Sequence, residues 1–226
     1  MDRTFRDRQD AGIQLAAQLL RYAGDPRCGA NPNVVVLGLP RGGVPVAYQV
    51  ARRLQAPLDI FVVRKLGVPG HRELAMGAIA TGGIRVLNPE VVTGLRISEP
   101  MIAAVAAQEQ QELERQRRAY RGELPFPDLA GRVVIVVDDG LATGSTMRAA
   151  VRALRQMQPA RIVVAAPVAA AETCRSLAQE ADEVVCVSTP ESFYAVSMWY
   201  QDFSQTSDEE VRLLLESSMH AGGAIV

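Results

Sequence analysis

Short runs of apolar, mostly β-branched residues recur along the chain, separated by stretches in which apolar residues return at helical spacing. Such runs, bounded by turn residues, are typical of strands covered on both faces of a parallel sheet. They predict strands at 34–39, 57–63, 133–137, 161–167 and 183–187. Because helical patterns alternate with these runs, we expect an α/β fold with a mostly parallel, doubly covered sheet, formed by a single domain over the whole chain.

The spacing of apolar residues also predicts the helices around these strands. The helix at 98–120 has a thin apolar stripe and many mixed charges, so we expect an exposed helical insertion, with an oligomer contact such as a homodimer as the alternative. Acidic residues interleave its basic end, which indicates that it does not bind nucleic acid. The other helices are expected at 6–22, 46–54, 147–157, 171–180 and after the capping box that begins at Ser207.

Glycine, proline and aromatic residues mark three segments of different character. Apolar residues at 76–81 and 84–87 flank two glycines, a pattern that predicts a β-hairpin. The preceding segment, 66–73, is rich in Gly, Pro and ionisable residues, which makes it a poor candidate for a fixed core element. Aromatic residues cluster in 189–203, so 189–226 is expected to form a C-terminal hood and helix.

The residues directly after the strand at 133–137 carry the clearest chemical signal. Asp138 and Asp139 lie where parallel α/β sheets bind ligands, and two carboxylates there are costly unless solvated or paired. The small, hydroxyl-rich loop 140–146 then opens a helix, whose first N–H groups and dipole favour an anion. These features predict a sugar-phosphate site. A structural turn with Ser145 as N-cap is the alternative, but it does not explain the second Asp.

A second loop of related composition follows the strand at 34–39. Its glycines, Gly42 and Gly43, let backbone N–H groups approach an anion, and Arg41 can bind that anion with two donors. The alternative is a tight turn with a surface Arg. The loop is therefore a second, weaker anion-binding prediction.

The apolar run, the paired acids and the following Ala-Thr-Gly-Ser-Thr resemble the loop that binds phosphoribosyl pyrophosphate (PRPP) in type I phosphoribosyltransferases. The earlier Arg-Gly-Gly loop is similar to the pyrophosphate loop of that family, and the two loops occur in the family's order. The overall pattern most resembles bacterial members whose acceptor is unassigned. The resemblance implies the fold of the family and assigns PRPP to Arg41, Gly42, Gly43, Arg64, Lys65, Asp138, Asp139, Gly140, Leu141, Ala142, Thr143, Gly144, Ser145 and Thr146.

The implied reaction is Mg²⁺-dependent transfer of the phosphoribosyl group from PRPP to a small nitrogenous base, with release of pyrophosphate. The acids would hold the ribose hydroxyls, the basic residues would neutralise pyrophosphate, and Mg²⁺ would bridge its oxygens. No protein nucleophile is needed, and no protein metal site is assigned. The catalytic residues that the resemblance implies are Arg64, Lys65, Asp138 and Asp139.

The resemblance further implies a lid and a base site. A loop that closes over the sugar is expected at 66–73, where it would exclude water. This lid could bring His71 and Glu73 to the reacting sugar. The alternative is that both are only solvated loop residues. The candidates for stacking on the base are Phe193, Tyr194 and Trp199. The alternative is that these residues pack the C-terminal segment onto the core.

One departure from the family limits the acceptor. Ala142 occupies a position that is often acidic in hypoxanthine/guanine transferases, so the loop is closer to the adenine or orotate branches. The main alternative function is a non-catalytic PRPP or nucleotide-binding regulator. A third is a hydrolase or phosphorylase, which would need His71 or Glu73 to supply its water or phosphate site.

Composition narrows the class of protein further. The 226 residues include 24 basic and 25 acidic ones, a formal net charge of -1, which implies no polyanion partner. Cys28, Cys174 and Cys186 share no metal-ligand spacing and cannot all pair, which favours reduced thiols in a cytoplasmic protein. The charged N-terminus predicts no secretory signal. No apolar run reaches the roughly 18 residues of a membrane span.

Overall fold

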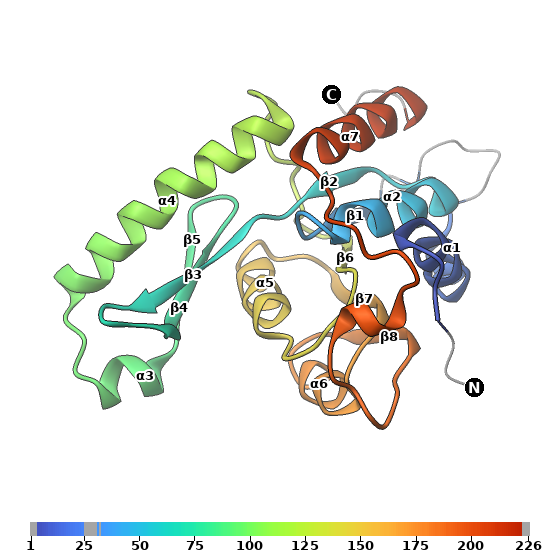
Figure 1. Cartoon of the computed structure of the whole chain (residues 1–226). Coiled ribbons are helices and arrows are strands. Elements are labelled where there is room, and N and C mark those ends of the chain that lie inside the picture. Colours follow the sequence, from blue (N-terminus) through green and yellow to red (C-terminus); the bar gives the residue numbers. More distant parts are fainter. Residues whose placement is uncertain (1–3, 25–30, 32, 223–226) are drawn as a thin grey trace.

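The computed structural model describes residues 4–24, 31 and 33–222, and its main sheet has five parallel strands (Figure 1). The order is β2-β1-β6-β7-β8, and every neighbouring pair is parallel. The predicted α/β fold with a mostly parallel sheet is therefore confirmed. The strands are β1 (Val34–Gly38), β2 (Leu58–Ile60), β6 (Val133–Val137), β7 (Arg161–Val168) and β8 (Glu183–Ser188).

Helices cover both faces of this sheet, because its strands are apolar on both faces. In β1, Val36 packs with residues of α1 and α2, whereas Val35 and Leu37 pack with residues of α5 and α6. Within the described ranges, no helix combines the length and the apolar character needed to cross a membrane. The helices are α1 (Arg8–Gln18), α2 (Gly43–Leu54), α3 (Pro89–Gly94), α4 (Glu99–Arg121), α5 (Ser145–Gln156), α6 (Ala171–Leu177) and α7 (Asp208–Gly222), with 3₁₀ turns η1 (Leu20–Tyr22) and η2 (Val196–Trp199).

A second sheet of three antiparallel strands extends to one side of the main sheet (Figure 1). The hairpin that was predicted around the two glycines is confirmed as the last two of these strands. The single strand predicted at 57–63 is wrong, because the segment is divided between the main sheet and the small one. The small sheet consists of β3 (Val63–Val68), β4 (His71–Ala80) and β5 (Ile84–Leu87).

The prediction that 66–73 is a poor candidate for a fixed core element is also wrong, since these residues form the adjoining ends of β3 and β4. Leu66 and Val68 are buried, which anchors the end of β3 in the core. Gly70 has φ of +83° and so supplies the left-handed conformation that the connecting turn needs. The glycine and proline residues thus mark a turn between two strands, with a register irregularity on either side of Gly67.

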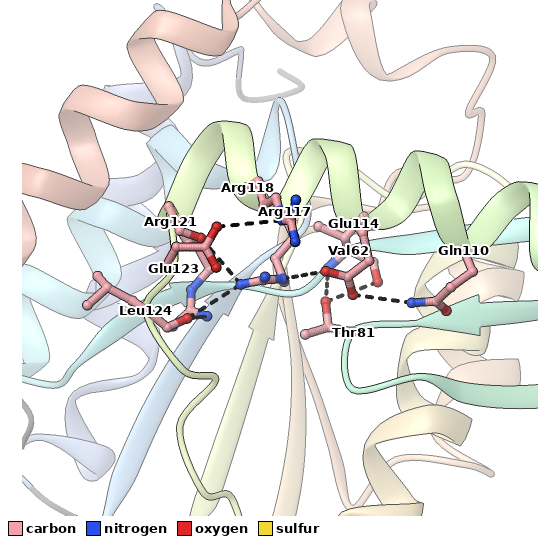
Figure 2. A network of polar contacts seen from close by, with 10 residues as sticks. Val62, Thr81, Gln110, Glu114, Arg117, Arg118, Arg121, Glu123 and Leu124 are labelled. Atoms are coloured by element: carbon pink, nitrogen blue, oxygen red, sulfur yellow. Dashed lines mark hydrogen bonds and ion pairs between the residues drawn. The ribbon is translucent and has the colours of Figure 1, made fainter.

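The long helix α4 runs across the small sheet towards α7 (Figure 1). It begins after Ser98 and buries one face, contributed by Ile102, Ala106, Leu113 and Tyr120. Its other residues form polar contacts along the helix, such as those of Glu114 with Arg117 in Figure 2. The helix is therefore a packed element with one solvated face.

The C-terminal segment returns to the N-terminus of the chain. Phe5 forms an isolated parallel bridge with Tyr200, and Trp199 joins the same buried cluster. Phe193 and Phe203 pack against this cluster while remaining partly exposed. The segment after β8 is therefore held against the first described residues.

Two of the cysteines lie close together without forming a disulfide bond. Cys174 of α6 and Cys186 of β8 are free thiols, and their Sγ atoms are 3.3 Å apart. The hydrogen bond between them lowers the pKa of Cys174 and raises the pKa of Cys186. Cys28 lies outside the described residues.

Candidate functional site

The two predicted anion-binding loops meet at the carboxyl end of the sheet. β1 and β6 are neighbours and pair in register from Val34↔Val133 to Gly38↔Val137, so the loops that follow them begin side by side. A Cβ atom on Gly42 would lie 1.9 Å from Asp139 Oδ2, and one on Gly43 would lie 2.6 Å from Val137 O. Only glycine fits at these two positions, because any side chain would overlap the loop after β6.

The loop after β6 is fixed by β7 and α6. Leu141 N donates to Val168 O at 2.9 Å, and Thr173 Oγ1 donates to Ala142 O at 2.5 Å. Gly144 has φ of +66° and is the N-cap of α5, so the alternative in which Ser145 is the N-cap is wrong. Ala142 and Thr143 are exposed at the start of α5, where the first backbone N–H groups of a helix and its dipole favour an anion.

The two acids are held in a buried, charged cluster. Asp139 N donates to Asp138 Oδ1 at 2.9 Å, and Arg8 Nε donates to Asp139 Oδ2 at 2.8 Å. Burial, and then the neighbouring carboxylate of Asp139, raise the pKa of Asp138 well above its usual range. Burial also raises the pKa of Asp139, while Arg8 opposes that shift. The pair is therefore suited to accept hydrogen bonds when ionised, and one cation already offsets part of its charge.

Two of the three predicted pyrophosphate-binding cations lie beside acidic side chains. Arg41 Nη1 is 3.6 Å from Asp208 Oδ1, and both residues line a cavity of about 250 Å³ that also borders α4. Arg64 Nε is 2.6 Å from Glu109 Oε2 of α4. Lys65, the next residue of β3, is exposed. The structure thus brings Arg41 into the loop beside the acid pair, whereas α4 holds Arg64.

The predicted lid and base residues lie in different surroundings. His71 is exposed at the start of β4, and Glu73 falls in the same strand, although its side chain is outside the described set. Trp199 is 7% exposed and stacks on Phe193, with ring centroids 6.4 Å apart. Tyr194 is 83% exposed. Trp199 therefore packs the C-terminal segment, and Tyr194 is free of that packing.

Two residues at this site were missed by sequence reasoning. Arg8 pairs with Asp139, and Tyr200 donates its hydroxyl hydrogen to Asp139 O at 2.5 Å. Burial, and then the charge of Asp139, raise the pKa of Tyr200. No local pattern in the sequence singles out Arg8, because the first eight residues contain several arginines at similar spacing.

The fold and the loops define a class of protein: an α/β protein that presents paired acids and an anion-binding helix start at the carboxyl end of a parallel sheet. Residues 6–201 match the model of a protein family described as "Phosphoribosyl transferase domain". The chain therefore belongs to the phosphoribosyl transferase domain family, which confirms the resemblance drawn from its loops.

Two curated proteins of Mycobacterium tuberculosis, from strains CDC 1551 and H37Rv, both named "Putative phosphoribosyl transferase", are 47% identical to this chain over 212 residues. The match covers 94% of this chain and 46% of each relative, so the chain spans about half the length of the curated relatives it matches. The crystal structure of TT1426 from Thermus thermophilus is similar with a TM-score of 0.81 and 42% identity, covering 97% of this chain and 100% of that one.

Proposed function

We propose that this chain is a Mg²⁺-dependent phosphoribosyltransferase that transfers the 5-phosphoribosyl group of PRPP to a nitrogenous base and releases pyrophosphate. The observation that carries the proposal is the contact between the two loops, in which a Cβ on Gly42 would lie 1.9 Å from Asp139 Oδ2. A loop for pyrophosphate and acids for the ribose must reach the same PRPP molecule. Membership of the family supports the same activity.

In the proposed reaction, a ring nitrogen of the base attacks C1 of the ribose as the C1–O bond to pyrophosphate breaks, and the base loses a proton. Positive charge develops on the ribose and negative charge on pyrophosphate, so binding and electrostatics supply most of the catalysis. Asp138 and Asp139 would accept hydrogen bonds from the ribose hydroxyls. The start of α5 would bind the 5′-phosphate through backbone N–H groups, and Arg41, Arg64 and Lys65 would neutralise pyrophosphate.

The Mg²⁺ in this proposal would be bound chiefly by the oxygens of PRPP itself. Among the described residues, no group of three or more His, Cys, Asp or Glu side chains could hold a metal ion. Mg²⁺ usually keeps several waters and is often held by substrate phosphates. When bound, it would offset charge on the departing pyrophosphate.

The direct test incubates the protein with PRPP, Mg²⁺ and a panel of purine, pyrimidine and other nitrogenous bases, and measures released pyrophosphate together with the nucleotide product. We expect at least one base to give equal amounts of the two. PRPP binding measured by calorimetry, with no pyrophosphate from any base, would reject the transferase. Failure to bind PRPP at all would reject the site itself.

Substitution of the acids tests the roles assigned to them. Asp138→Asn and Asp139→Asn should each weaken PRPP binding by about tenfold or more, because each replaces a charged acceptor with a neutral amide. The matched control is Asp128→Asn, at an exposed acid in the loop before β6. Its Oδ1 accepts from Ala130 N, a bond that Asn can keep, so PRPP binding should not change. Unaltered binding in both site variants would contradict the assignment.

The second candidate function is a non-catalytic PRPP or nucleotide-binding regulator. The ion pairs of Arg41 with Asp208 and of Arg64 with Glu109 favour it, since both cations are already engaged by acids. A transferase has to release them for pyrophosphate. Asp208→Asn and Glu109→Gln should therefore increase pyrophosphate formation in a transferase, and should change only binding in a regulator.

A further inference from the structure

Arg8 occupies a junction of three segments beside the acid pair. It is the first residue of α1, directly after the N-cap Asp7, whose Oδ1 accepts from Asp10 N at 2.7 Å. Its side chain is only 12% exposed. Its Nε donates to Asp139 Oδ2 at 2.8 Å. Burial of an arginine at a helix start is costly unless its donors are satisfied, so this position calls for partners on several sides.

The other partners of Arg8 come from the C-terminal segment. Nη1 donates to Ser204 O at 2.6 Å, and the guanidinium carbon lies 4.0 Å from the centre of the Phe203 ring. The Phe203 ring also packs against Tyr200, whose hydroxyl donates to Asp139 O. Arg8 therefore connects the start of α1, the loop after β6 and the C-terminal segment.

The same contacts reach the loop after β1. A Cβ on Gly42 would lie 1.9 Å from Asp139 Oδ2 and 3.2 Å from Arg8 Nε, so the Gly42 backbone lies against the ion pair. One oxygen of the Asp139 carboxylate is thus enclosed by Arg8 on one side and by Gly42 on the other. Such enclosure fixes the rotation of the carboxylate, as partners behind a functional group do.

We propose that Arg8 is a positioning residue for PRPP: it holds Asp139 Oδ2 so that Oδ1 is directed at a ribose hydroxyl, and it joins the C-terminal segment to the ribose site. This inference rests on the proposed function of the acid pair. Arg8 acts through Asp139, and it contacts neither the reacting carbon nor the leaving group.

The charged and titratable groups around Asp139 determine how this role can be measured. They are Arg8 from α1, Asp138 in the same loop, and Tyr200 in the C-terminal segment, while Asp202 lies close enough for Arg8 to lower its pKa. Burial raises the pKa of Asp139, and Arg8 lowers it. Removal of the guanidinium should raise the pKa of Asp139 further. In the variant, the Asp139 carboxylate should then be protonated at pH values at which the intact chain keeps it ionised, and PRPP binding should weaken at those pH values.

The experiment measures PRPP affinity by calorimetry with Mg²⁺ at several pH values, in the intact chain and in three variants. Arg8→Gln should weaken binding by about tenfold at neutral pH, with a larger loss at lower pH, because it removes the cation beside the acid. Arg8→Lys should recover part of the affinity, since it restores the charge without the two-sided geometry of the guanidinium. Arg6→Gln is the matched control, because Arg6 is 74% exposed and pairs with Asp10.

A double substitution separates positioning from a general structural role. If Arg8 acts through Asp139, adding Arg8→Gln to Asp139→Asn should cause little further loss of affinity and no further change with pH. Equal pH dependence in the intact chain and Arg8→Gln would overturn the inference, and so would a full additional loss in the double variant. Lack of PRPP binding by the intact chain would instead reject the proposed function, and this inference with it.

A milder variant keeps the test decisive if Arg8→Gln does not fold, as judged by thermal denaturation. Phe203→Leu removes the ring 4.0 Å from the guanidinium carbon, so Arg8 loses one of the supports that hold it beside Asp139. It should shift the pH dependence of PRPP binding in the same direction by a smaller amount. An unchanged profile in a folded Phe203→Leu protein, with affinity also unchanged in Arg8→Lys, would overturn the inference.

Discussion

At position 42, the neighbouring Asp139 carboxylate leaves room for glycine alone. A Cβ at this position would lie 1.9 Å from Asp139 Oδ2 and 2.7 Å from Asp139 Cγ, so the loop after β1 has no space for a side chain. Glycine is needed here for close approach, because the backbone at this residue has ordinary right-handed angles. The proposed binding of one PRPP molecule by both loops depends on this contact.

We expect Gly42→Ala to weaken PRPP binding by about tenfold or more and to destabilise the fold by about 1–3 kcal/mol, the usual cost of overpacking. The added methyl group must displace the Asp139 carboxylate or the loop. Calorimetry with PRPP and urea denaturation measure the two effects.

Gly94→Ala is the control for this substitution. Gly94 ends α3, and a Cβ there would meet no atom within 4 Å. The free energy of unfolding of Gly94→Ala should stay the same or rise by about 0.5–1 kcal/mol, since alanine is favoured over glycine in helices. Equal PRPP affinity in Gly42→Ala and Gly94→Ala would show that the close approach of the loops is unimportant.

At the scale of elements, α4 is attached to the main sheet by a buried ion pair. Arg121 Nε is 2.5 Å from Asp59 Oδ1 of β2, and Arg121 Nη2 is 2.6 Å from Asp59 Oδ2. The side chains are only 8% and 12% exposed. Arg121 Nη1 also donates to Leu124 O at 3.0 Å. Burial raises the pKa of Asp59 to about 6, although Arg121 opposes this shift.

Arg121→Met should lower the free energy of unfolding by about 3–5 kcal/mol at pH 8, because it leaves the Asp59 charge buried and unpaired. Without the guanidinium, the folded-state pKa of Asp59 should rise further above its unfolded value. A carboxyl group with a raised folded-state pKa favours folding at low pH, and that contribution is lost as the pH rises through this pKa. The loss should therefore be smaller at pH 5 than at pH 8, as measured by urea denaturation.

Arg118→Met provides the comparison on the same helix. Arg118 is 65% exposed and lies 3.6 Å from Glu123, so its removal should change stability by no more than about 0.5 kcal/mol. A similar loss in both variants, or a larger loss for Arg121→Met at pH 5, would contradict the role given to the Asp59 pair.

At the scale of the whole molecule, the chain has a buried parallel sheet and a smaller sheet beside it (Figure 1). The last four residues of β6 are fully buried, whereas the connection between β3 and β4 is exposed around Gly70. Such differences in burial usually produce differences in local opening. We therefore expect the connection between β3 and β4 to open more readily than β6.

Hydrogen exchange should show slow amide exchange in β6 and β7 and fast exchange around residues 66–73. If that segment closes over PRPP, adding PRPP and Mg²⁺ should slow exchange both there and in the loop at 140–146. Protection of 140–146 alone would indicate that the small sheet is not a lid. An unrelated nucleotide at the same concentration serves as the control for general stabilisation.

The sequence was most informative where interacting residues are close along the chain. The strand, the acids and the helix start from Val133 to Thr146 form one continuous unit, so their order alone predicts the anion site. Likewise, Ser207 Oγ accepts from Glu210 N at 3.0 Å, as the capping box predicted. The segment 66–73 was misjudged because its glycine and proline residues mark a turn without showing that strands continue on both sides of it.

The local pattern of the chain by itself determined the parallel sheet, the two loops and their family, because strand periodicity and loop chemistry are written in consecutive residues. Only the tertiary structure decided which side chains support those loops. Arg8 is 131 positions from Asp139 and Tyr200 is 61 positions away, and no short-range pattern constrains pairs at such separations. Folding brings them together because α1 and the C-terminal segment pack at the carboxyl end of the sheet, where buried acids require partners.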